Sequence, residues 1–175
     1  TGQIVSVNVD NIKQLISEAG VLPVDESLYN VTSGFGMRID PFDKTKRFHK
    51  GLDIASEYIG GRKVVSVLDG IVVYKSTNSS YGNYIVVNHG EFDTLYAHLE
   101  GFARDVDIGT PVEAGDVIGY VGSTGRSTGP HLHLEFDVDW VRVDPEIFMN
   151  LLIDNPTNKS THMIDFDYFK QKYGK

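Results

Sequence analysis

Two histidines separated by one residue lie within residues 128–136, and their spacing is typical of a site on one face of a β-strand. Because side chains alternate between the faces of a strand, His131, His133 and Glu135 should share one face, while Leu132 and its apolar neighbours face the core. Two imidazoles about 7 Å apart can share a polar site, in which one binds a metal ion and the other transfers protons. The alternative is a solvated strand face, which is the simpler interpretation of an isolated His-x-His pair.

A second pair of candidate ligands is His49 and Asp53. Four residues of straight strand span about 13 Å, which is too far for two ligands of one metal ion. Gly51 lies between them and permits a sharp bend that would bring the two side chains together. Alone the pattern favours a surface loop. Together with one of the strand histidines it predicts a three-ligand zinc site whose fourth position stays open for water.

A third candidate is His98, at the end of residues 94–99. Alternation predicts that Thr94, Tyr96 and His98 share one face and that the apolar residues between them face the core. His98 would then support a ligand or take part in catalysis, unless it is a hydrogen-bonded surface histidine. Tyr96 would either line the groove beside His98 or pack within its strand.

The other polar candidates have simpler interpretations. Glu135 either orients a metal ligand or is solvated, and the solvated state is the expectation. His89 is expected to be structural, and His162 is given no role. A basic run from Lys44 to Lys50 adjoins His49. It either forms a solvated loop or attracts carboxylates and anionic wall polymers.

Composition limits the chemistry. The chain of 175 residues has six histidines and no cysteine, so disulfides, cysteine-ligated metals and thiol nucleophiles are excluded. It carries 16 Lys and Arg against 24 Asp and Glu, a formal net charge of −8. That balance argues against binding nucleic acid or anionic lipid. We expect neither a membrane span nor a signal peptide within the sequence.

Short strands must position these residues. From residue 31 to residue 143, apolar and polar residues alternate between turn residues roughly every ten positions, which predicts a mainly β, antiparallel β-sandwich of hairpins. Strands are expected at residues 63–68, 71–75, 83–89, 93–99, 117–121 and 131–138.

Helices are expected near both ends of the chain. Helical spacing over residues 8–19 predicts a helix that Asp10 caps and Gly20 ends, and Pro145 opens a second helix over residues 146–153. Residues 165–173 are expected to form a docked helix or a flexible tail.

A series of short motifs also occurs in a fixed order. The motifs are Ser33-Gly34-Phe35-Gly36-Met37-Arg38, Asp40-Pro41, His49-x-Gly51-x-Asp53-Ile54-Ala55, Tyr81-Gly82-Asn83, Asn88-His89-Gly90, Thr94-x-Tyr96-Ala97-His98-Leu99, Gly122-x-Thr124-Gly125 and Gly129-Pro130-His131-Leu132-His133-x-Glu135. In these motifs the sequence closely resembles the lysostaphin-type (LytM-like) zinc metallopeptidases, which cut peptide bonds in bacterial peptidoglycan. The resemblance extends from about residue 33 to residue 148.

The resemblance implies roles for five residues. His49, Asp53 and His133 would bind one Zn²⁺ ion, and His131 and His98 would be the catalytic histidines, either of which can act as the base. The chain would then be a zinc metalloendopeptidase that hydrolyses stem cross-links or cross-bridges with zinc-activated water. Such an enzyme would act outside the cell or in the envelope, as a bacterial or phage lysin, and is expected to be monomeric as a domain.

The same resemblance divides the chain into an N-terminal helix and connector (1–30), a zinc metallopeptidase domain (31–153) and a C-terminal linker with a helix or tail (154–175). A non-enzymatic wall-binding or scaffold module of the same fold is the main alternative, although all five functional positions are filled here. A phosphocarrier or lipoyl-type carrier fits less well. The hairpin at residues 112–121 lacks the lysine that a lipoyl domain modifies, and a phosphocarrier does not need Gly-Pro-His-Leu-His.

Overall fold

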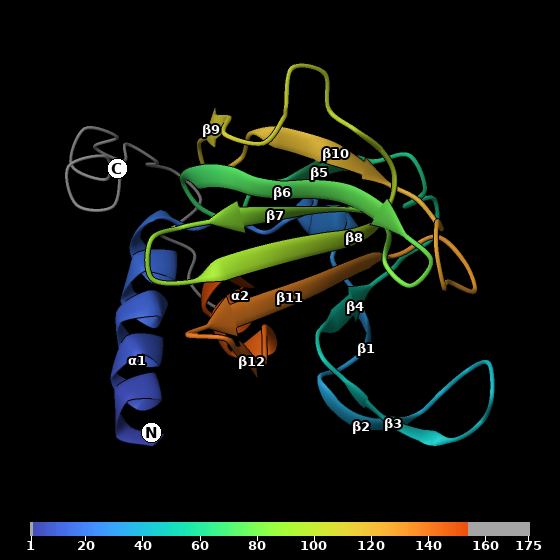
Figure 1. The fold of residues 1–175 in the computed structure, drawn as a ribbon, viewed down its shortest axis with the longest axis horizontal. Helices are drawn as coiled ribbons and strands as arrows, with labels where there is room; N and C mark the ends of the chain where they lie inside the picture. Colours follow the sequence, from blue (N-terminus) through green and yellow to red (C-terminus); the bar gives the residue numbers. More distant parts are fainter. Residues whose placement is uncertain (1, 154–175) are drawn as a thin grey trace.

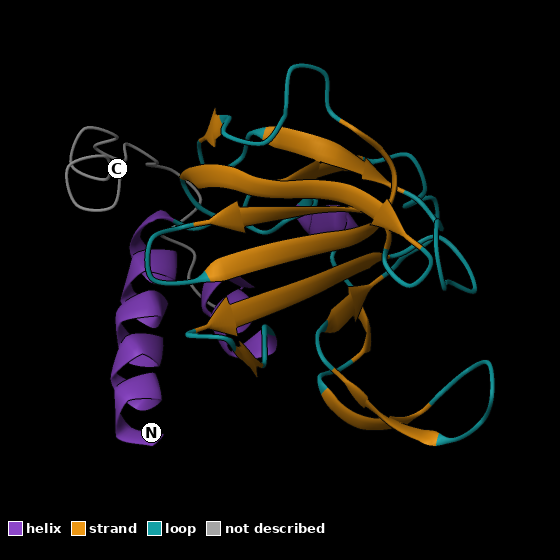
Figure 2. Ribbon diagram, in the orientation of Figure 1, coloured by secondary structure: helices purple, strands orange, loops and turns teal. Residues whose placement is uncertain are grey.

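Antiparallel strands are the main regular structure within residues 2–153, which are the residues described by the structure, a computed structural model (Figures 1 and 2). The strands are β1 (Val31–Ser33), β2 (Gly36–Ile39), β3 (Lys46–His49), β4 (Leu52–Ile54), β5 (Lys63–Val65), β6 (Gly70–Asn78), β7 (Gly82–Asn88), β8 (Asp93–Phe102), β9 (Pro111–Val112), β10 (Val117–Val121), β11 (Leu132–Val138) and β12 (Val141–Val143). The helices are α1 (Gly2–Ala19), α2 (Glu146–Ile153) and a 3₁₀ turn at Glu26–Leu28. No helix in this part of the chain combines the length and apolarity needed to cross a membrane.

Ten of the strands form one sheet, in which β1, β4, β11, β8, β7, β6 and β9 are neighbours in that order. Strand β12 extends the sheet from β11, and β10 joins β8 to β5. Strands β2 and β3 form a separate hairpin, which projects from the end of the molecule opposite α1 (Figure 1). The prediction of a mainly β, antiparallel fold with short helices near both ends is confirmed.

The sheet curves around a single core because β8 pairs with β7 and β11 along one part and with β10 along another. Side chains from both parts of the sheet therefore belong to one core cluster. Val64 and Ile118 come from β5 and β10, and Ile85 and Leu134 come from β7 and β11. The predicted strand at residues 117–121 and the helix at residues 146–153 have the expected bounds.

Helix α1 begins at Gly2, so the prediction that Asp10 caps it is wrong. No glycine or proline interrupts residues 3–9, so nothing in the sequence stops the helix at Asp10. Ile12 and Ile16 are fully buried in the core cluster, and α1 packs against α2. The helix ends as expected at Gly20, whose N–H donates to the carbonyl of Ile16 at 2.8 Å. The prediction for residues 165–173 lies outside the described residues.

His89 is fully buried and hydrogen-bonded, which agrees with the structural interpretation. Its Nδ1 lies 2.8 Å from the carbonyl oxygen of Asp69, and its Nε2 lies 2.8 Å from the hydroxyl of Thr94. The ring also packs against Phe92 at a tilt of 30°, with the two ring centres 4.7 Å apart. Burial lowers the pKa of His89 from 6.5 to about 4, although the hydrogen bond to Asp69 opposes this shift.

We expect the free energy of unfolding to fall as the pH falls from about 6.5 towards 4, because His89 takes up a proton in the unfolded chain but not in the folded one. The contribution of His89 can reach about 3 kcal/mol, since each pKa unit corresponds to about 1.4 kcal/mol. Denaturant unfolding of the metal-free protein at several pH values measures this slope. The variant His89→Gln should have a smaller slope, and equal slopes in both proteins would contradict this role of His89.

Candidate metal centre

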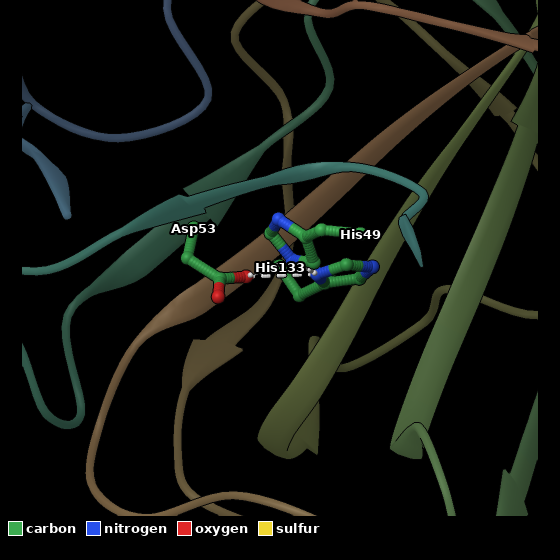
Figure 3. Close-up of side chains that lie close together, drawn as sticks. All are labelled: His49, Asp53 and His133. Atoms are coloured by element: carbon green, nitrogen blue, oxygen red, sulfur yellow. Dashed lines mark hydrogen bonds and ion pairs between the residues drawn. The ribbon is translucent and has the colours of Figure 1, made fainter. Parts of the chain in front are cut away.

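Strand β11 carries its two kinds of side chain on opposite faces, as the alternation predicts. Leu132 and Leu134 lie in the core, whereas His133 faces the cleft. Strand β4 pairs with β11 so that Asp53 is directly opposite His133. The register of the sheet therefore brings the carboxylate and the imidazole together, with 2.8 Å between Asp53 Oδ1 and His133 Nδ1 (Figure 3).

His49 reaches the same point from the β2–β3 hairpin, of which it is the last residue. Its Nε2 lies 3.2 Å from Asp53 Oδ1 and 3.3 Å from His133 Nδ1 (Figure 3). Gly51 joins the hairpin to β4 and is required for a reason that the sequence does not reveal. A Cβ atom at Gly51 would lie 2.4 Å from the carbonyl oxygen of Leu134, and the residue does not have a positive φ. Glycine is therefore needed here because the chain passes close to β11.

The variant Gly51→Ala should separate β4 from β11 and so spread the three side chains of the cluster. We expect a loss of roughly 1–3 kcal/mol in the free energy of unfolding, as for other overpacked sites. We also expect weaker metal binding, because the clash falls on the backbone beside His133. Denaturant unfolding and zinc titration measure the two effects. Gly101→Ala is the matched control, since a Cβ there would meet no atom within 4 Å. Equal behaviour of the two variants would contradict this explanation.

The three side chains form a group that fits a metal ion. His49 Nδ1 lies 2.8 Å from the carbonyl oxygen of Gly34, which can only accept, so a neutral His49 ring carries its proton there and leaves Nε2 bare. This bare nitrogen faces a carboxylate oxygen of Asp53, and two such acceptors this close need either a proton or a metal ion between them. All three residues are buried, and they form the one group of this kind found within residues 2–153. Two imidazole nitrogens and a carboxylate oxygen match the ligands that Zn²⁺ takes.

The charges of the cluster are strongly coupled. Burial alone would raise the pKa of Asp53, but hydrogen bonds from His133 and His49 hold it well below its usual range. Burial alone would lower the pKa of His133, but hydrogen bonds to Asp53 and Glu135 raise it to about 9. Without a metal, both nitrogens of His133 therefore donate to carboxylates. A bound metal ion would replace the proton on Nδ1.

Glu135 is not solvated, so that expectation is wrong. The side chain is 1% exposed and accepts a hydrogen bond from His133 Nε2 at 2.9 Å. Arg38 makes a similar contact with Asp53, because its guanidinium donates to Asp53 Oδ2 at 3.3 Å. The contact between Glu135 and His133 lies within one strand and is the alternative that the sequence left open, whereas the contact of Arg38 depends on how β2 and β4 are placed.

His131 and His98 lie beside the cluster. His131 Nε2 is 3.7 Å from Asp53 Oδ1, and the ring centres of His98 and His131 are 4.7 Å apart. His131 Nδ1 is 2.9 Å from the carbonyl oxygen of Gly129, and His98 Nδ1 is 2.7 Å from that of Thr124. A carbonyl only accepts, so each ring carries its proton on Nδ1 when neutral and leaves Nε2 free. Burial lowers the pKa of His98 to about 4, which keeps this ring neutral near pH 7.

The prediction that Thr94, Tyr96 and His98 share one face of strand β8 is wrong. Thr94 and Tyr96 are fully buried, and the Tyr96 hydroxyl accepts from the backbone N–H of Val67 instead of lining the groove. Strict alternation would place His98 on this core side as well. The backbone of His98 has φ 61°, in the left-handed region, and this break redirects its ring to the site.

Two glycine motifs hold His98 in place. The backbone N–H of His98 donates to the carbonyl of Tyr81 at 2.8 Å, while Thr124 accepts from its ring. The segments containing Tyr81 and Thr124 touch at Gly82 and Gly125, both of which have positive φ. A Cβ atom at Gly82 would lie 2.3 Å from Thr124 Oγ1, so these segments can meet only through glycine.

The site opens into a cleft of about 620 Å³. Its wall includes cationic residues from the β2–β3 hairpin, the connection to β4 and the loop before β11, namely Arg38, Arg47, Lys50 and Arg126. Asp40 fixes one of them, because its carboxylate accepts from Arg126 at 2.7 Å. Arg47 and Lys50 of the basic run therefore border the same cleft as His49, Asp53 and His133. His162 lies outside the described residues.

Comparisons with known proteins give the same family. A sequence model named "Peptidase family M23" matches residues 47–145. Over 138 residues the chain is 38% identical to the DD-carboxypeptidase/endopeptidase Mpg of Neisseria meningitidis serogroup B, covering 78% of this chain and 31% of that protein. It is 34% identical to the peptidoglycan DD-endopeptidase ShyB of Vibrio cholerae, covering 85% of this chain and 36% of that protein. The chain thus spans about a third of the length of these relatives.

Two solved structures are also similar. A zinc-containing peptidase from Vibrio cholerae has a TM-score of 0.63 and 39% identity, with 70% of this chain and 37% of that chain covered. The catalytic domain of lysostaphin from Staphylococcus simulans has a TM-score of 0.61 and 30% identity, with 70% and 92% covered.

Proposed function

The chain belongs to peptidase family M23, and from this premise we propose that it is a zinc metalloendopeptidase that hydrolyses peptide bonds in bacterial peptidoglycan. The observation that carries the proposal is the convergence of His49, Asp53 and His133 beside two histidines with free Nε2 atoms. The names of the relatives support peptidoglycan as the substrate and the cell envelope as the place of action.

His49, Asp53 and His133 would hold one zinc ion through His49 Nε2, a carboxylate oxygen and His133 Nδ1, the atoms that lie closest together. Zinc bound there would lower the pKa of a water ligand to about 7 and would polarise the scissile carbonyl.

His131 and His98 would move the protons. Each ring is fixed by a carbonyl at Nδ1, so Nε2 can take the proton that water loses when it attacks the peptide carbon. The same nitrogen can pass that proton to the amine released when the C–N bond breaks. The other ring can donate a hydrogen bond to the oxyanion only if solvent has already protonated its Nε2 before water attacks. Both histidines have an accepting Nε2, so either can serve as the base.

The walls of the cleft support an anionic substrate. The formal net charge of the chain is −8, yet Arg38, Arg47, Lys50 and Arg126 line the cleft around the site. The three arginines pair there with aspartates, and Lys50 has no ion-pair partner among residues 2–153. Stem peptides of peptidoglycan carry free carboxylates, which such a wall attracts. The products of the reaction would identify which peptide bond is cut.

Digestion of purified peptidoglycan by the zinc-loaded chain, with products identified by mass, tests this function. We expect new amino and carboxyl termini from one kind of peptide bond, loss of the reaction in chelator, and recovery on addition of zinc. Hydrolysis that persists in a zinc-free sample would contradict the proposal. A protein that binds zinc and peptidoglycan but releases no product would instead support a wall-binding module of the same fold.

A further inference from the structure

Glu135 is a buried carboxylate surrounded by hydrogen-bond donors. One oxygen, Oε1, lies 2.8 Å from the hydroxyl of Tyr81 and 2.9 Å from His133 Nε2. The other oxygen, Oε2, accepts from Nε of Arg142 at 2.7 Å. Arg142 is held in turn by a hydrogen bond and ion pair with Asp137. An ionised carboxylate can only accept hydrogen bonds, so each of these neighbours donates to it.

This arrangement determines which nitrogen of His133 is free for a metal ion. Because Glu135 accepts at Oε1, the proton of a neutral His133 ring stays on Nε2 and the lone pair is on Nδ1. Nδ1 is the atom that faces Asp53 and His49, at 2.8 and 3.3 Å. A ring with the other tautomer would present a proton to the cluster.

The fold brings Arg142 to this position through the hairpin of β11 and β12. The two strands are joined by a two-residue turn, Asp139 and Trp140, in which both residues have positive φ, as tight hairpin turns require. The resulting register places Arg142 directly opposite Asp137, from where its guanidinium reaches Glu135. Trp140 is 95% exposed, so packing of its side chain does not explain the hairpin.

We infer that Glu135, Arg142 and Tyr81 are positioning residues that fix the orientation and tautomer of His133 and thereby raise the affinity of the site for its metal ion. Arg142 and Tyr81 act through Glu135, and Glu135 acts through the ring of His133. The inference rests on the proposed function only in that the metal is taken to be zinc. Loss of such an outer contact typically weakens metal binding about 10- to 100-fold.

The variant Glu135→Gln tests the inference with little change in shape. A glutamine has one accepting and one donating end, whereas all neighbours of Glu135 donate. If the amide oxygen faces His133, the NH₂ group faces the N–H donor of Arg142, and the hydrogen bond to Arg142 is lost. If the amide is flipped, its NH₂ group favours the wrong tautomer of His133. We therefore expect zinc affinity, measured by competition with a chromogenic chelator, to fall by about 10- to 100-fold.

Imidazole ¹⁵N shifts of the zinc-loaded protein give a second readout, which a loss of packing alone would not move. In the parent protein the Nε2 proton of His133 should be observed in slow exchange, and in Glu135→Gln it should exchange faster or be lost. Arg142→Gln should weaken zinc binding by about tenfold, and Tyr81→Phe by less, because it removes one of the three donors. If Glu135→Gln does not fold, Arg142→Gln and Tyr81→Phe test the inference in its place.

Arg62→Gln is the matched control for Arg142→Gln, because it makes the same change at an arginine that donates to the carbonyl of Tyr58 and does not contact Glu135. We expect it to keep zinc affinity within about threefold of the parent protein, less than the typical loss. Unchanged affinity and an unchanged Nε2 proton in Glu135→Gln and Arg142→Gln would overturn the inference. Both measurements are independent of hydrolysis, so a protein that cuts no peptidoglycan could still show them, and an active protein could still fail them.

Discussion

Replacing His133 by alanine is expected to remove bound zinc and to lower kcat/KM for peptidoglycan peptides by about three orders of magnitude or more. The reason is that the metal contributes several kcal/mol of transition-state stabilisation, and each 1.4 kcal/mol is about tenfold in rate. His133 Nδ1 lies within hydrogen-bond distance of both Asp53 and His49, so its loss leaves only two of the three proposed ligands. Zinc content after dialysis and release of peptide fragments measure the two effects.

His89→Gln is the control for this variant, since it also removes a buried histidine, but one whose ring bonds only to Asp69 and Thr94 away from the cluster. It should keep one zinc ion per chain and its rate of hydrolysis. A His133→Ala protein that remains folded, binds zinc as the parent does and hydrolyses peptidoglycan at the same rate would contradict the ligand assignment.

The second large effect concerns proton transfer. Replacing His131 or His98 by asparagine is expected to lower kcat by about 10²- to 10⁴-fold, the range for loss of a general acid or base, while zinc content stays the same. Asparagine suits this test because its side-chain amide can keep the donor that each ring presents to a backbone carbonyl. It also tolerates the left-handed backbone of His98, at φ 61°.

The double variant should lose less than the product of the single losses, because the two rings act in one proton-transfer step. Steady-state kinetics on a defined stem-peptide substrate, together with zinc analysis of the same samples, measure this. Loss of zinc in either variant would show that the histidine is a ligand, and a kcat within about twofold of the parent protein would show that it does not transfer protons.

Strand β11 shows what the sequence could predict. Its histidines alternate with Leu132, Leu134 and Phe136, and a strand with one wholly apolar face can be placed in only one way on the core. The side on which His133 lies was therefore predictable. The strand order was not, because β11 lies between β4 and β8, which come from distant parts of the chain.

His98 shows why local alternation can mislead. The apolar side chains of residues 94–99 all belong to one face of the strand, which predicts that this face alone is buried. Thr94 and Tyr96, on the other face, are nevertheless buried, because their hydroxyl groups form hydrogen bonds inside the core. A single left-handed residue then reverses the alternation. No feature of the strand itself marks that reversal, and its cause is contact with the loops that contain Tyr81 and Thr124.

The outer contacts of the cluster were the least predictable part. Arg38 lies in a motif shared with the family, but its distance to Asp53 depends on the fold of the β2–β3 hairpin. Arg142 belongs to no motif and reaches Glu135 only through the register of β11 and β12. Predicting either contact requires knowledge of how the strands pack, which residue types and their spacing do not provide.

His49, Asp53 and His133 are proposed to bind one zinc ion together. Anomalous diffraction at the zinc absorption edge, from crystals of the zinc-loaded chain, tests it most directly. The structure predicts one peak per chain, within bonding distance of His49 Nε2, an Asp53 carboxylate oxygen and His133 Nδ1. A peak elsewhere on the protein, or no peak between these three side chains, would contradict the account.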